Sequence, residues 1–407
     1  MKAVGVIVEY NPFHNGHALH LEGAKNASGA DVVIAAMSGN FLQRGEPALV
    51  SKWTRAKMAM EAGVDLVFEL PYQYATQQAE IFAFGGVSLL QSAGCESVCF
   101  GSESGNIKAF EYTYEFLNDH EHIFQSKIKQ HMQNGVSYPK ALSLSFLDLG
   151  PADSMIDLSQ PNNILGYQYI KAARRLKKPL QMITVQRQSA GYHDDHFASS
   201  TIASATSIRS ALFSKNKQIA EILNYVPKTT YKLLLQYIEQ YGTFHHWEQY
   251  WQLLKYRLLS SSPEELKAIY EVEEGIENRL LAHVSDADSF NDFMMRIKTK
   301  RYTWTRIQRI CLHILTNAKK SEMDVTDKHV PYLRLLGMSE KGRQYLSENK
   351  KQITIPIVSK LSAYKGADIA LDIRASKLYQ MAIPSEKQEL YQDFTATPIY
   401  QAKEERI

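Results

Sequence analysis

The sequence predicts an α/β protein: a Rossmann-like parallel sheet with flanking helices, followed by a mainly helical carboxyl-terminal region. Two observations carry this prediction. Short apolar runs alternate with helical patterns up to about residue 212, and long helical patterns dominate after Phe213. Strand–helix alternation at this spacing is typical of parallel sheets with right-handed crossovers. A third observation, a Gly- and His-containing segment directly after the first apolar run, places a site at the start of the sheet.

Five apolar runs, rich in β-branched and small residues, are the predicted strands: Val4–Val8, Val32–Met37, Leu66–Glu69, Ser97–Phe100 and Leu180–Val185. Helical patterns separate them at about Gly16–Ala27, Lys52–Ala62, Phe82–Ala93, Ile107–Gly135 and Asn163–Arg175. Ligands of such sheets bind at the carboxyl ends of the strands. We therefore expect the chemistry in the loops that follow Val8, Met37, Phe100 and Val185.

The second half differs in character, and we predict a domain boundary near residue 212, giving domains 1–212 and 213–407. Helical patterns run through Leu254, Pro263–Ala282, Phe290–Met295 and Trp304–Asn317. Two pieces, Lys351–Val358 and Ile369–Leu371, are strand-like. No internal repeat is visible.

Composition narrows the class of protein. The 407 residues are 44% hydrophobic and 22% charged, and no run of 18 apolar residues indicates a membrane span. The first apolar stretch is short and is followed by Glu9 and Tyr10, which favours a buried strand over a signal peptide. Cys95, Cys99 and Cys311 have neither a disulfide nor a zinc pattern. We expect buried thiols and a cytoplasmic protein without a membrane partner.

The strongest local motif is His14-Asn15-Gly16-His17, which follows the first strand and opens a helix. A helix start presents free N–H groups and partial positive charge to phosphate. Two histidines three residues apart share one face of the opening turn, where they can donate to phosphate oxygens as charge develops. Capping or packing histidines are the alternative, and a metal site is a weaker one because no carboxylate or cysteine set accompanies the pair.

This motif resembles the HxGH signature of the nucleotidylyltransferase superfamily, whose second signature is ISSTxIR. The segment at residues 204–209 is similar to the second signature at Ser204, Thr206, Ile208 and Arg209, and the chain departs from it at Ala203 and Ala205. The likeness implies that Thr206 and Arg209 contact phosphate. For Thr206 a plain helix cap is the alternative, whereas an arginine fork suits phosphate oxygens.

Further segments narrow the resemblance to one bacterial family, the tRNA(Met) cytidine acetate ligases. They are residues 9–17, 38–48, 100–103, 161–166 and 300–303. The resemblance implies an ATP-dependent ligase acting in two steps. Acetate attacks the α-phosphate of ATP to give acetyl-adenylate, and the exocyclic amine of the wobble cytidine in elongator tRNA(Met) then takes the acetyl group. ATP is thus the implied co-substrate, with Mg²⁺ beside it, for which the sequence assigns no protein ligand.

The resemblance also implies the ATP contacts, with His14 and His17 as catalytic residues. These contacts are Ile7, Val8, Glu9, Tyr10, Asn11, Pro12, Phe13, His14, Asn15, Gly16, His17, Ala18, Leu19, His20, Gly101, Asn162, Arg187, Thr206 and Arg209. Three of them have structural alternatives: Gly101 as a turn glycine, Asn162 as a helix cap and Arg187 as a surface charge.

Residues 38–48 form a polar segment after the second strand and are a candidate acceptor pocket, with Asn40, Gln43, Arg44 and Glu46 facing acetate or a flipped base. A structured surface loop is the alternative. Lys52 and Arg55 open the next helix, and the sequence leaves phosphate and solvent equally open as their surroundings.

The basic segment lies in the second half. Residues 293–321 hold no Asp or Glu, although the formal net charge of the whole chain is only +3. Clustered Lys and Arg suit a phosphate-rich partner, and Tyr302 or Trp304 can stack on an unpaired base. The predicted tRNA contacts are Lys298, Lys300, Arg301, Arg306 and Arg309. A solvated helix face with buried aromatics is the alternative.

Two other functions stay open at this stage. A small-molecule adenylyltransferase of cofactor biosynthesis would share the nucleotide motifs but leave the basic segment unexplained. A non-catalytic RNA-binding protein with a relict nucleotide fold would not depend on His17.

Overall fold

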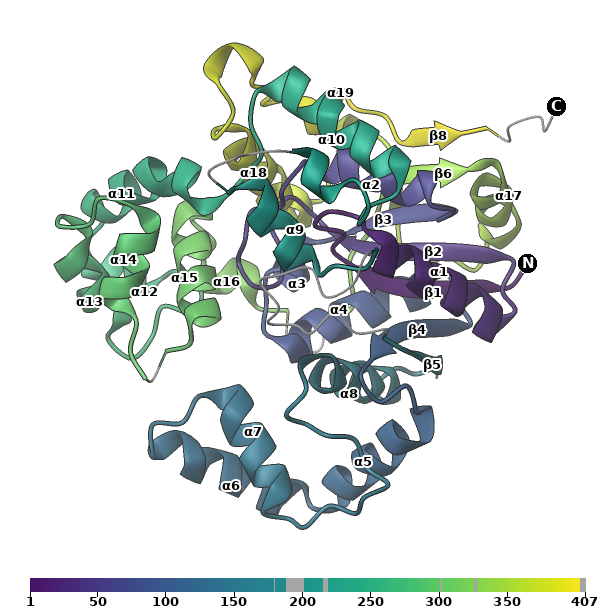
Figure 1. Ribbon diagram of the computed structural model, residues 1–407, viewed down its shortest axis with the longest axis horizontal. Helices are drawn as coiled ribbons and strands as arrows, with labels where there is room; N and C mark the ends of the chain where they lie inside the picture. Colours follow the sequence, from purple (N-terminus) through teal and green to yellow (C-terminus); the bar gives the residue numbers. More distant parts are fainter. Residues whose placement is uncertain (179, 188–200, 215–218, 301, 326–327, 403–407) are drawn as a thin grey trace.

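The computed structural model describes residues 1–178, 180–187, 201–214, 219–300, 302–325 and 328–402. Within these ranges eight strands form one sheet in the order β5-β4-β1-β2-β3-β6, and β7 and β8 both pair with β6 (Figure 1). The strands are β1 (Ala3–Val8), β2 (Val32–Ser38), β3 (Leu66–Leu70), β4 (Ser97–Ser102), β5 (Gln181–Gln186), β6 (Leu333–Ser339), β7 (Ile357–Val358) and β8 (Ile399–Gln401). β6 runs antiparallel to β3, and the other pairings are parallel.

Helices connect and cover the strands. Up to residue 214 they are α1 (Asn15–Ser28), α2 (Lys52–Glu61), α3 (Tyr72–Ala75), α4 (Ala79–Ser92), α5 (Ile107–Asp119), α6 (Glu121–Gln133), α7 (Tyr138–Leu147), α8 (Pro161–Arg174) and α9 (Ala205–Leu212). Later ones include α10 (Lys228–Tyr241), α11 (Trp251–Leu259), α12 (Pro263–Lys267), α13 (Ile276–Val284), α14 (Phe290–Ile297), α15 (Trp304–Thr316), α16 (Lys320–Met323), α17 (Glu340–Asn349), α18 (Ala370–Gln380) and α19 (Gln392–Thr395). Short 3-10 turns are η1 (Ile219–Ile222), η2 (Trp247–Tyr250), η3 (Leu361–Ala363), η4 (Ala367–Ile369) and η5 (Ser385–Lys387).

Both faces of the sheet are buried under helices, so the alternating side chains of one strand enter two different core clusters. In β2, Ile34 packs with α4 and α8 in one core cluster, whereas Val33 and Ala35 pack with α1, α2 and α10 in another. A third cluster holds α11, α13, α14 and α15 together and reaches the sheet domain through Phe41 and Tyr72. The helical region is therefore packed against the loops at the end of the sheet.

The predicted fold class is confirmed, and each of the five predicted strands is present. The prediction of a strand at Ile369–Leu371 is wrong, because these residues lie in η4 and α18, and of Lys351–Val358 only Ile357–Val358 is a strand. Residues 333–339, which form β6, were not predicted, since a short apolar run does not distinguish strand from helix. The boundary near residue 212 stays a prediction; β6, β7 and β8 lie beyond it yet join the same sheet.

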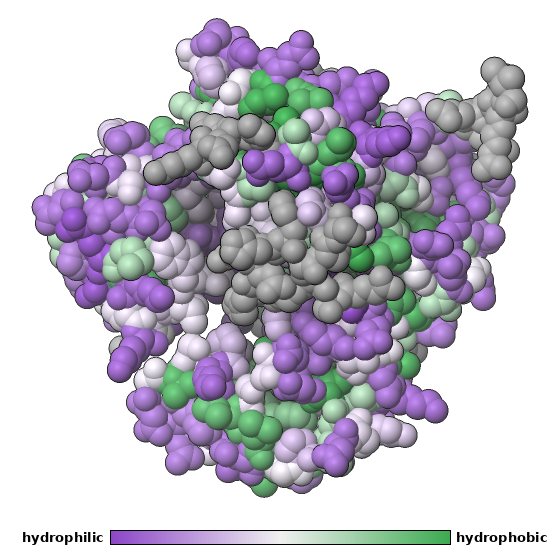
Figure 2. Space-filling view, viewed as in Figure 1, coloured by the Kyte–Doolittle hydropathy of each residue, from purple (hydrophilic) through white to green (hydrophobic). Residues whose placement is uncertain are grey.

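Two helical lobes project from the sheet domain. The lobe of α11 to α16 lies on the left of Figure 1 and the lobe of α5 to α7 lies below. Figure 2 shows a largely hydrophilic outer surface on the left lobe and hydrophobic residues gathered on the lower one. Ile123 of α6 and Leu147 of α7 are exposed. No helix among the described residues has the length and apolarity to cross a membrane. Cys95, Cys99 and Cys311 are buried free thiols, as expected.

A buried ion cluster fastens the end of the chain to the sheet. The Lys52 ammonium donates to Glu69 Oε1 and Oε2 at 2.9 and 2.8 Å, and to Asp393 Oδ2 at 2.9 Å. It also donates to the Ser376 hydroxyl of α18 at 3.1 Å. Lys52 is 1% exposed, so its charge is compensated by these partners and not by water. The prediction left phosphate and solvent open for Lys52, and the structure contradicts both.

Replacing Lys52 tests this cluster. Lys52→Met removes the cation that bonds both Glu69 and Asp393 and leaves Arg334 as their remaining buried cation, which we expect to cost about 3–5 kcal/mol of unfolding free energy. Lys57→Met is the matched control, because Lys57 is an exposed lysine of the same helix and its loss is expected to cost less than about 0.5 kcal/mol. Urea unfolding of both variants gives the comparison; equal free energies would contradict the structural role of Lys52.

Candidate active site

The candidate site lies where the loops after β1, β2, β4 and β5 meet. Arg55 of α2 holds two of these loops together. Its guanidinium donates to the carbonyls of Glu9 at 2.6 Å, Ser38 at 3.0 Å, Val50 at 3.2 Å and also Gly39. Arg55 is 0% exposed, so its predicted alternatives, phosphate or solvent, are both wrong. The residue fixes the backbone from which the site side chains project.

The two motif histidines stack on each other at the start of α1. Their ring centroids lie 3.6 Å apart, with planes inclined by 25°. The backbone N–H of His14 donates to His17 Nδ1 at 3.2 Å. Because Nδ1 accepts, the neutral His17 ring carries its proton on Nε2, which makes Nε2 a donor. Tyr10 and Phe13 pack against the His17 ring at 4.9 and 5.6 Å and fix its orientation.

These imidazoles are neutral in this structure. Burial, together with the charges of Arg187 and Arg209, lowers the pKa of His14 to about 3. Burial, His14, Arg187 and His20 hold the pKa of His17 well below its usual value. Burial and Arg187 lower the pKa of His20 to about 4. Arg187 and Arg209 are therefore the cations of this group, and the neutral form of each histidine is favoured beside them.

The remaining residues of the predicted ATP segment differ in how far their side chains are buried. Ile7 and Val8 end β1, Pro12 and Phe13 are buried, Gly16 and Ala18 are half-buried in α1, and Leu19 is exposed at 43%. A Cβ added at Gly16 would lie 3.0 Å from His14 Cε1. Gly16 thus leaves room for the His14 ring, in addition to its predicted role of admitting an anion.

The second signature lies beside the first. Asn15 Nδ2 donates to the carbonyls of Thr201 and Asn224, each at 2.9 Å. Arg209 of α9 donates to the Asn11 carbonyl at 2.9 Å and to Glu46 Oε2 at 3.2 Å. Ser204 caps α9 by accepting from the Ser207 N–H, so the cap is Ser204 and not Thr206. Thr206 is half-buried in the first turn of that helix.

Gly101 and Arg187 complete one side of the site. Gly101 lies inside β4, paired with Val185, and not in a turn. A Cβ added there would lie 3.2 Å from Arg187 Cγ and 3.7 Å from His20 Cδ2. The glycine therefore lets Arg187 and His20 approach the strand, which places Arg187 at the site although its side chain is exposed.

Asn162 lies in the first turn of α8, whose cap is Gln160, so the alternative of a cap is excluded. Its amide nitrogen Nδ2 donates to Glu103 Oε1 at 2.7 Å, and its backbone N–H does so at 3.1 Å. Glu103 Oε2 accepts from the Asn163 N–H at 2.7 Å. Sequence reasoning gave Glu103 no role of its own. Its position directly after a strand was the signal available for it.

Several buried polar atoms at this edge are unsatisfied. They are Tyr10 Oη, Asn11 Nδ2, His14 Nδ1, His20 Nε2 and Ser38 Oγ, none of which has a hydrogen-bond partner among the described residues. Buried polar groups in folded proteins are nearly always paired. Five unpaired groups around the carboxyl ends of the strands and the start of α1 fit a polar ligand that would supply their partners.

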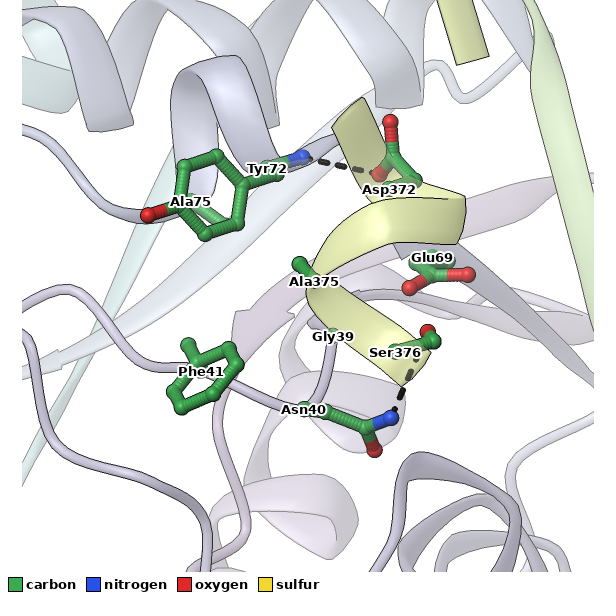
Figure 3. A pocket seen from close by; sticks show the side chains of 9 residues that line it. All are labelled: Gly39, Asn40, Phe41, Glu69, Tyr72, Ala75, Asp372, Ala375 and Ser376. Atoms are coloured by element: carbon green, nitrogen blue, oxygen red, sulfur yellow. Dashed lines mark hydrogen bonds between the residues drawn. The ribbon is translucent and has the colours of Figure 1, made fainter. Parts of the chain in front are cut away.

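The loop of residues 38–48 is mostly a structural element. Asn40 accepts from the Lys52 N–H and donates to Ser376 at 3.4 Å, as Figure 3 shows for Ser376. Behind it lies a cavity of about 10 Å³, which Glu69 and Asp372 help to line and which has room for about one water. The backbone N–H of Gln43 donates to Glu9 Oε1 at 2.8 Å. Glu46 is the loop's contact with Arg209.

The basic residues of the second half differ in their exposure, and some of them are ion-paired. Lys298 and Lys300 are exposed, and Arg306 is half-buried over the Tyr302 ring, 3.6 Å from Glu274. Arg309 is 8% exposed and donates to both oxygens of Glu271, at 2.7–3.1 Å. Arg309 is therefore occupied as an internal ion pair and does not present its guanidinium beside Arg306. Arg301 lies outside the described residues.

The sheet, the stacked histidines at the start of α1 and the arginines around them define the HIGH class of nucleotidyltransferases. The family model described as HIGH Nucleotidyl Transferase matches residues 1–393. Within this class the chain belongs to the tRNA(Met) cytidine acetate ligase family. It is 47% identical over 387 residues to the Bacillus subtilis protein of that name, covering 94% of this chain and 93% of the relative. Identity to the Geobacillus sp. relative is 48% over 404 residues, covering 98% of this chain and 100% of the relative.

Solved structures agree with this assignment. The chain resembles the apo crystal structure of Thermotoga maritima TmcAL with a TM-score of 0.92 and 33% identity, over 99% of this chain and 100% of that one. The same protein bound with alpha-thio ATP gives a TM-score of 0.90 over the same shares.

The neutral histidines generate a prediction about pH. A bound triphosphate brings negative charge to His14, His17 and His20 and raises their depressed pKa values, so ATP binding should take up protons below about pH 6.5. Affinity for ATP then rises as the pH falls, by up to about tenfold per pH unit for each proton taken up. Calorimetry in two buffers of different ionisation enthalpy measures this uptake.

His14→Gln should reduce the uptake, since glutamine does not titrate. His131→Gln, at a histidine paired with Asp148 outside the site, is the control and should leave the uptake unchanged. Affinity that is independent of pH between 5 and 7 would contradict the assignment of these imidazoles to the phosphate.

Proposed function

We propose that this chain is an ATP-dependent ligase that activates acetate as acetyl-adenylate. It then acetylates the exocyclic amine of the wobble cytidine in elongator tRNA(Met). The stacked, neutral His14–His17 pair at the positive end of α1, surrounded by unsatisfied buried polar atoms, is the observation that carries the proposal. Family membership supports it, since the relatives are named tRNA(Met) cytidine acetate ligase.

The first step follows from this geometry. The triphosphate lies along residues 7–20, with Gly101, Asn162, Arg187, Thr206 and Arg209 around it. His17 Nε2–H and His14 donate to phosphate oxygens while an acetate oxygen attacks the α-phosphorus and pyrophosphate leaves. Donors that are already oriented stabilise this developing charge without reorganisation, and no covalent enzyme intermediate is required.

The site residues also bear on Mg²⁺. Among the described residues no three His, Cys, Asp or Glu side chains gather as a metal site, and Glu46 and Glu103 are bonded to Arg209 and to Asn162–Asn163. Mg²⁺ commonly binds through substrate phosphates and water. We propose that it accompanies ATP in this way, held by phosphate oxygens.

Exchange of label tests the first step, and nucleoside analysis tests the second. Labelled pyrophosphate should enter ATP only when acetate is present, and His17→Ala should reduce this exchange by about 10²–10³-fold, the usual loss for one such donor. Mass spectrometry of the tRNA should find acetylcytidine at the wobble position of elongator tRNA(Met). Absence of acetate-dependent exchange in the unmodified protein, with tRNA present, would refute the proposal.

The exposed lysines generate a separate prediction on tRNA. We propose that Lys298, Lys300 and Arg306 contact tRNA phosphates, and we leave Arg309 out of this set because Glu271 holds it. Lys298→Gln with Lys300→Gln should weaken tRNA binding and reduce its salt dependence by about two phosphate contacts. ATP affinity should not change.

Lys350→Gln with Lys351→Gln removes the same charge from exposed lysines that follow α17, which makes it the matched control. Filter binding at several salt concentrations distinguishes the two pairs. An equal loss with both pairs would mean that total charge, and not this surface, determines binding.

A further inference from the structure

Three carboxylates follow strand ends at the candidate site, and two of them are committed to other residues. Glu46 accepts from Arg209 at 3.2 Å. Both oxygens of Glu103 accept hydrogen bonds from Asn162 and Asn163 at the start of α8. The third carboxylate, Glu9, directly follows β1 and precedes the histidine motif by five residues.

Glu9 is held in place but keeps one oxygen free. Its Oε1 accepts from the Gln43 N–H at 2.8 Å, and Gln43 is itself fixed by its side-chain bond to the Gln77 carbonyl at 2.6 Å. The Glu9 carbonyl accepts from Arg55. Among the residues that the structure describes, none donates to Glu9 Oε2, and the side chain is half-buried.

Burial favours a basic carboxylate at Glu9. Burial raises its pKa; the Gln43 N–H lowers it, Glu46 raises it, and Arg44 and Arg55 lower it, with a net rise. By contrast, burial lowers the pKa of His14 and His17, which makes them poor proton acceptors near neutral pH.

We propose that Glu9 is the general base of the acetyl-transfer step. This inference rests on the proposed function. The amine nitrogen of the nucleobase attacks the acetyl carbonyl carbon of acetyl-adenylate, forming the N–C bond. As the tetrahedral intermediate collapses, the bond from carbon to the phosphate oxygen breaks, and AMP leaves with the electron pair. The proton that the amine loses goes to Glu9 Oε2 and from there to solvent.

Measuring the two steps of the reaction separately distinguishes a general base of acetyl transfer from a residue that binds ATP. Glu9→Gln keeps the shape of the side chain and can still accept from the Gln43 N–H. Because Glu9 belongs to the segment along which the triphosphate is proposed to lie, we expect some loss of acetate-dependent pyrophosphate exchange, but a loss far smaller than the loss in acetyl transfer. Acetyl transfer to tRNA in a single turnover should fall by at least about 100-fold, a typical contribution of a general base. Acetyl-adenylate should then accumulate.

The matched control is Glu22→Gln, which removes an exposed carboxylate of α1 and should leave both rates unchanged. Glu9→Asp is a second test, because aspartate keeps the carboxylate on a shorter side chain and should retain part of the transfer rate. The transfer rate of the unmodified protein should rise with pH and level off above the pKa of Glu9, whereas the rate of Glu9→Gln should lack this rise.

The outcomes distinguish this inference from the proposed function. No exchange in the unmodified protein refutes the proposed function itself. Normal exchange with undiminished transfer in Glu9→Gln overturns only the role of Glu9 as base. Equal losses in both steps would also overturn it, since Glu9 would then position the nucleotide.

Discussion

The site depends on one buried cation, the guanidinium of Arg55. Where parallel strands end, their last carbonyls lose sheet partners, and a buried carbonyl without a donor is costly. Arg55 donates to carbonyls that follow both β1 and β2. Burial lowers its pKa to about 10, so it stays charged at neutral pH, and its hydrogen bonds are charge-assisted. The two loops that carry Glu9, the histidine motif and residues 38–48 are thereby held in one arrangement.

The loop of residues 38–48 joins the nucleotide edge to the helical lobe. On one side Gln43 and Glu46 contact Glu9 and Arg209. On the other, the Arg44 carbonyl accepts from Gln308 and the Gly45 carbonyl accepts from Trp247. Gly45 has φ +78°, and a Cβ there would lie 2.7 Å from the Arg309 backbone nitrogen. Only a glycine fits this contact without displacement, so the α15 helix packs directly against the loop.

Much of this architecture was predictable from local sequence. Strand–helix alternation gave the parallel sheet, and the position of His14–His17 after the first strand gave the start of the site. The features that sequence analysis missed or misjudged depend on contacts between residues that are far apart in the sequence. β6 finds its place by pairing with β3 across more than half of the chain, and no local pattern records that. Charge counting overestimated the basic face, because Arg309 of α15 is neutralised by Glu271, which lies well before α15 in the sequence. Lys52 and Arg55 looked like ordinary helix-opening cations, and only tertiary contacts with Glu69, Asp393 and the strand ends reveal their burial.

Burial of His14 and His17 explains why the proposed phosphate site holds neutral histidines beside Arg187 and Arg209. Further permanent cations here would repel Arg187 and Arg209 and destabilise the empty site. Neutral imidazoles avoid that repulsion while the Tyr10 and Phe13 rings and the His14 N–H keep the His17 ring oriented. In the proposed reaction, their interaction with phosphate oxygens would strengthen as negative charge moves onto those oxygens, which would favour the charged transition state over the resting site. A group that responds to charge in this way would contribute more to the reaction rate than to ground-state binding, because its orientation is already fixed before the charge develops.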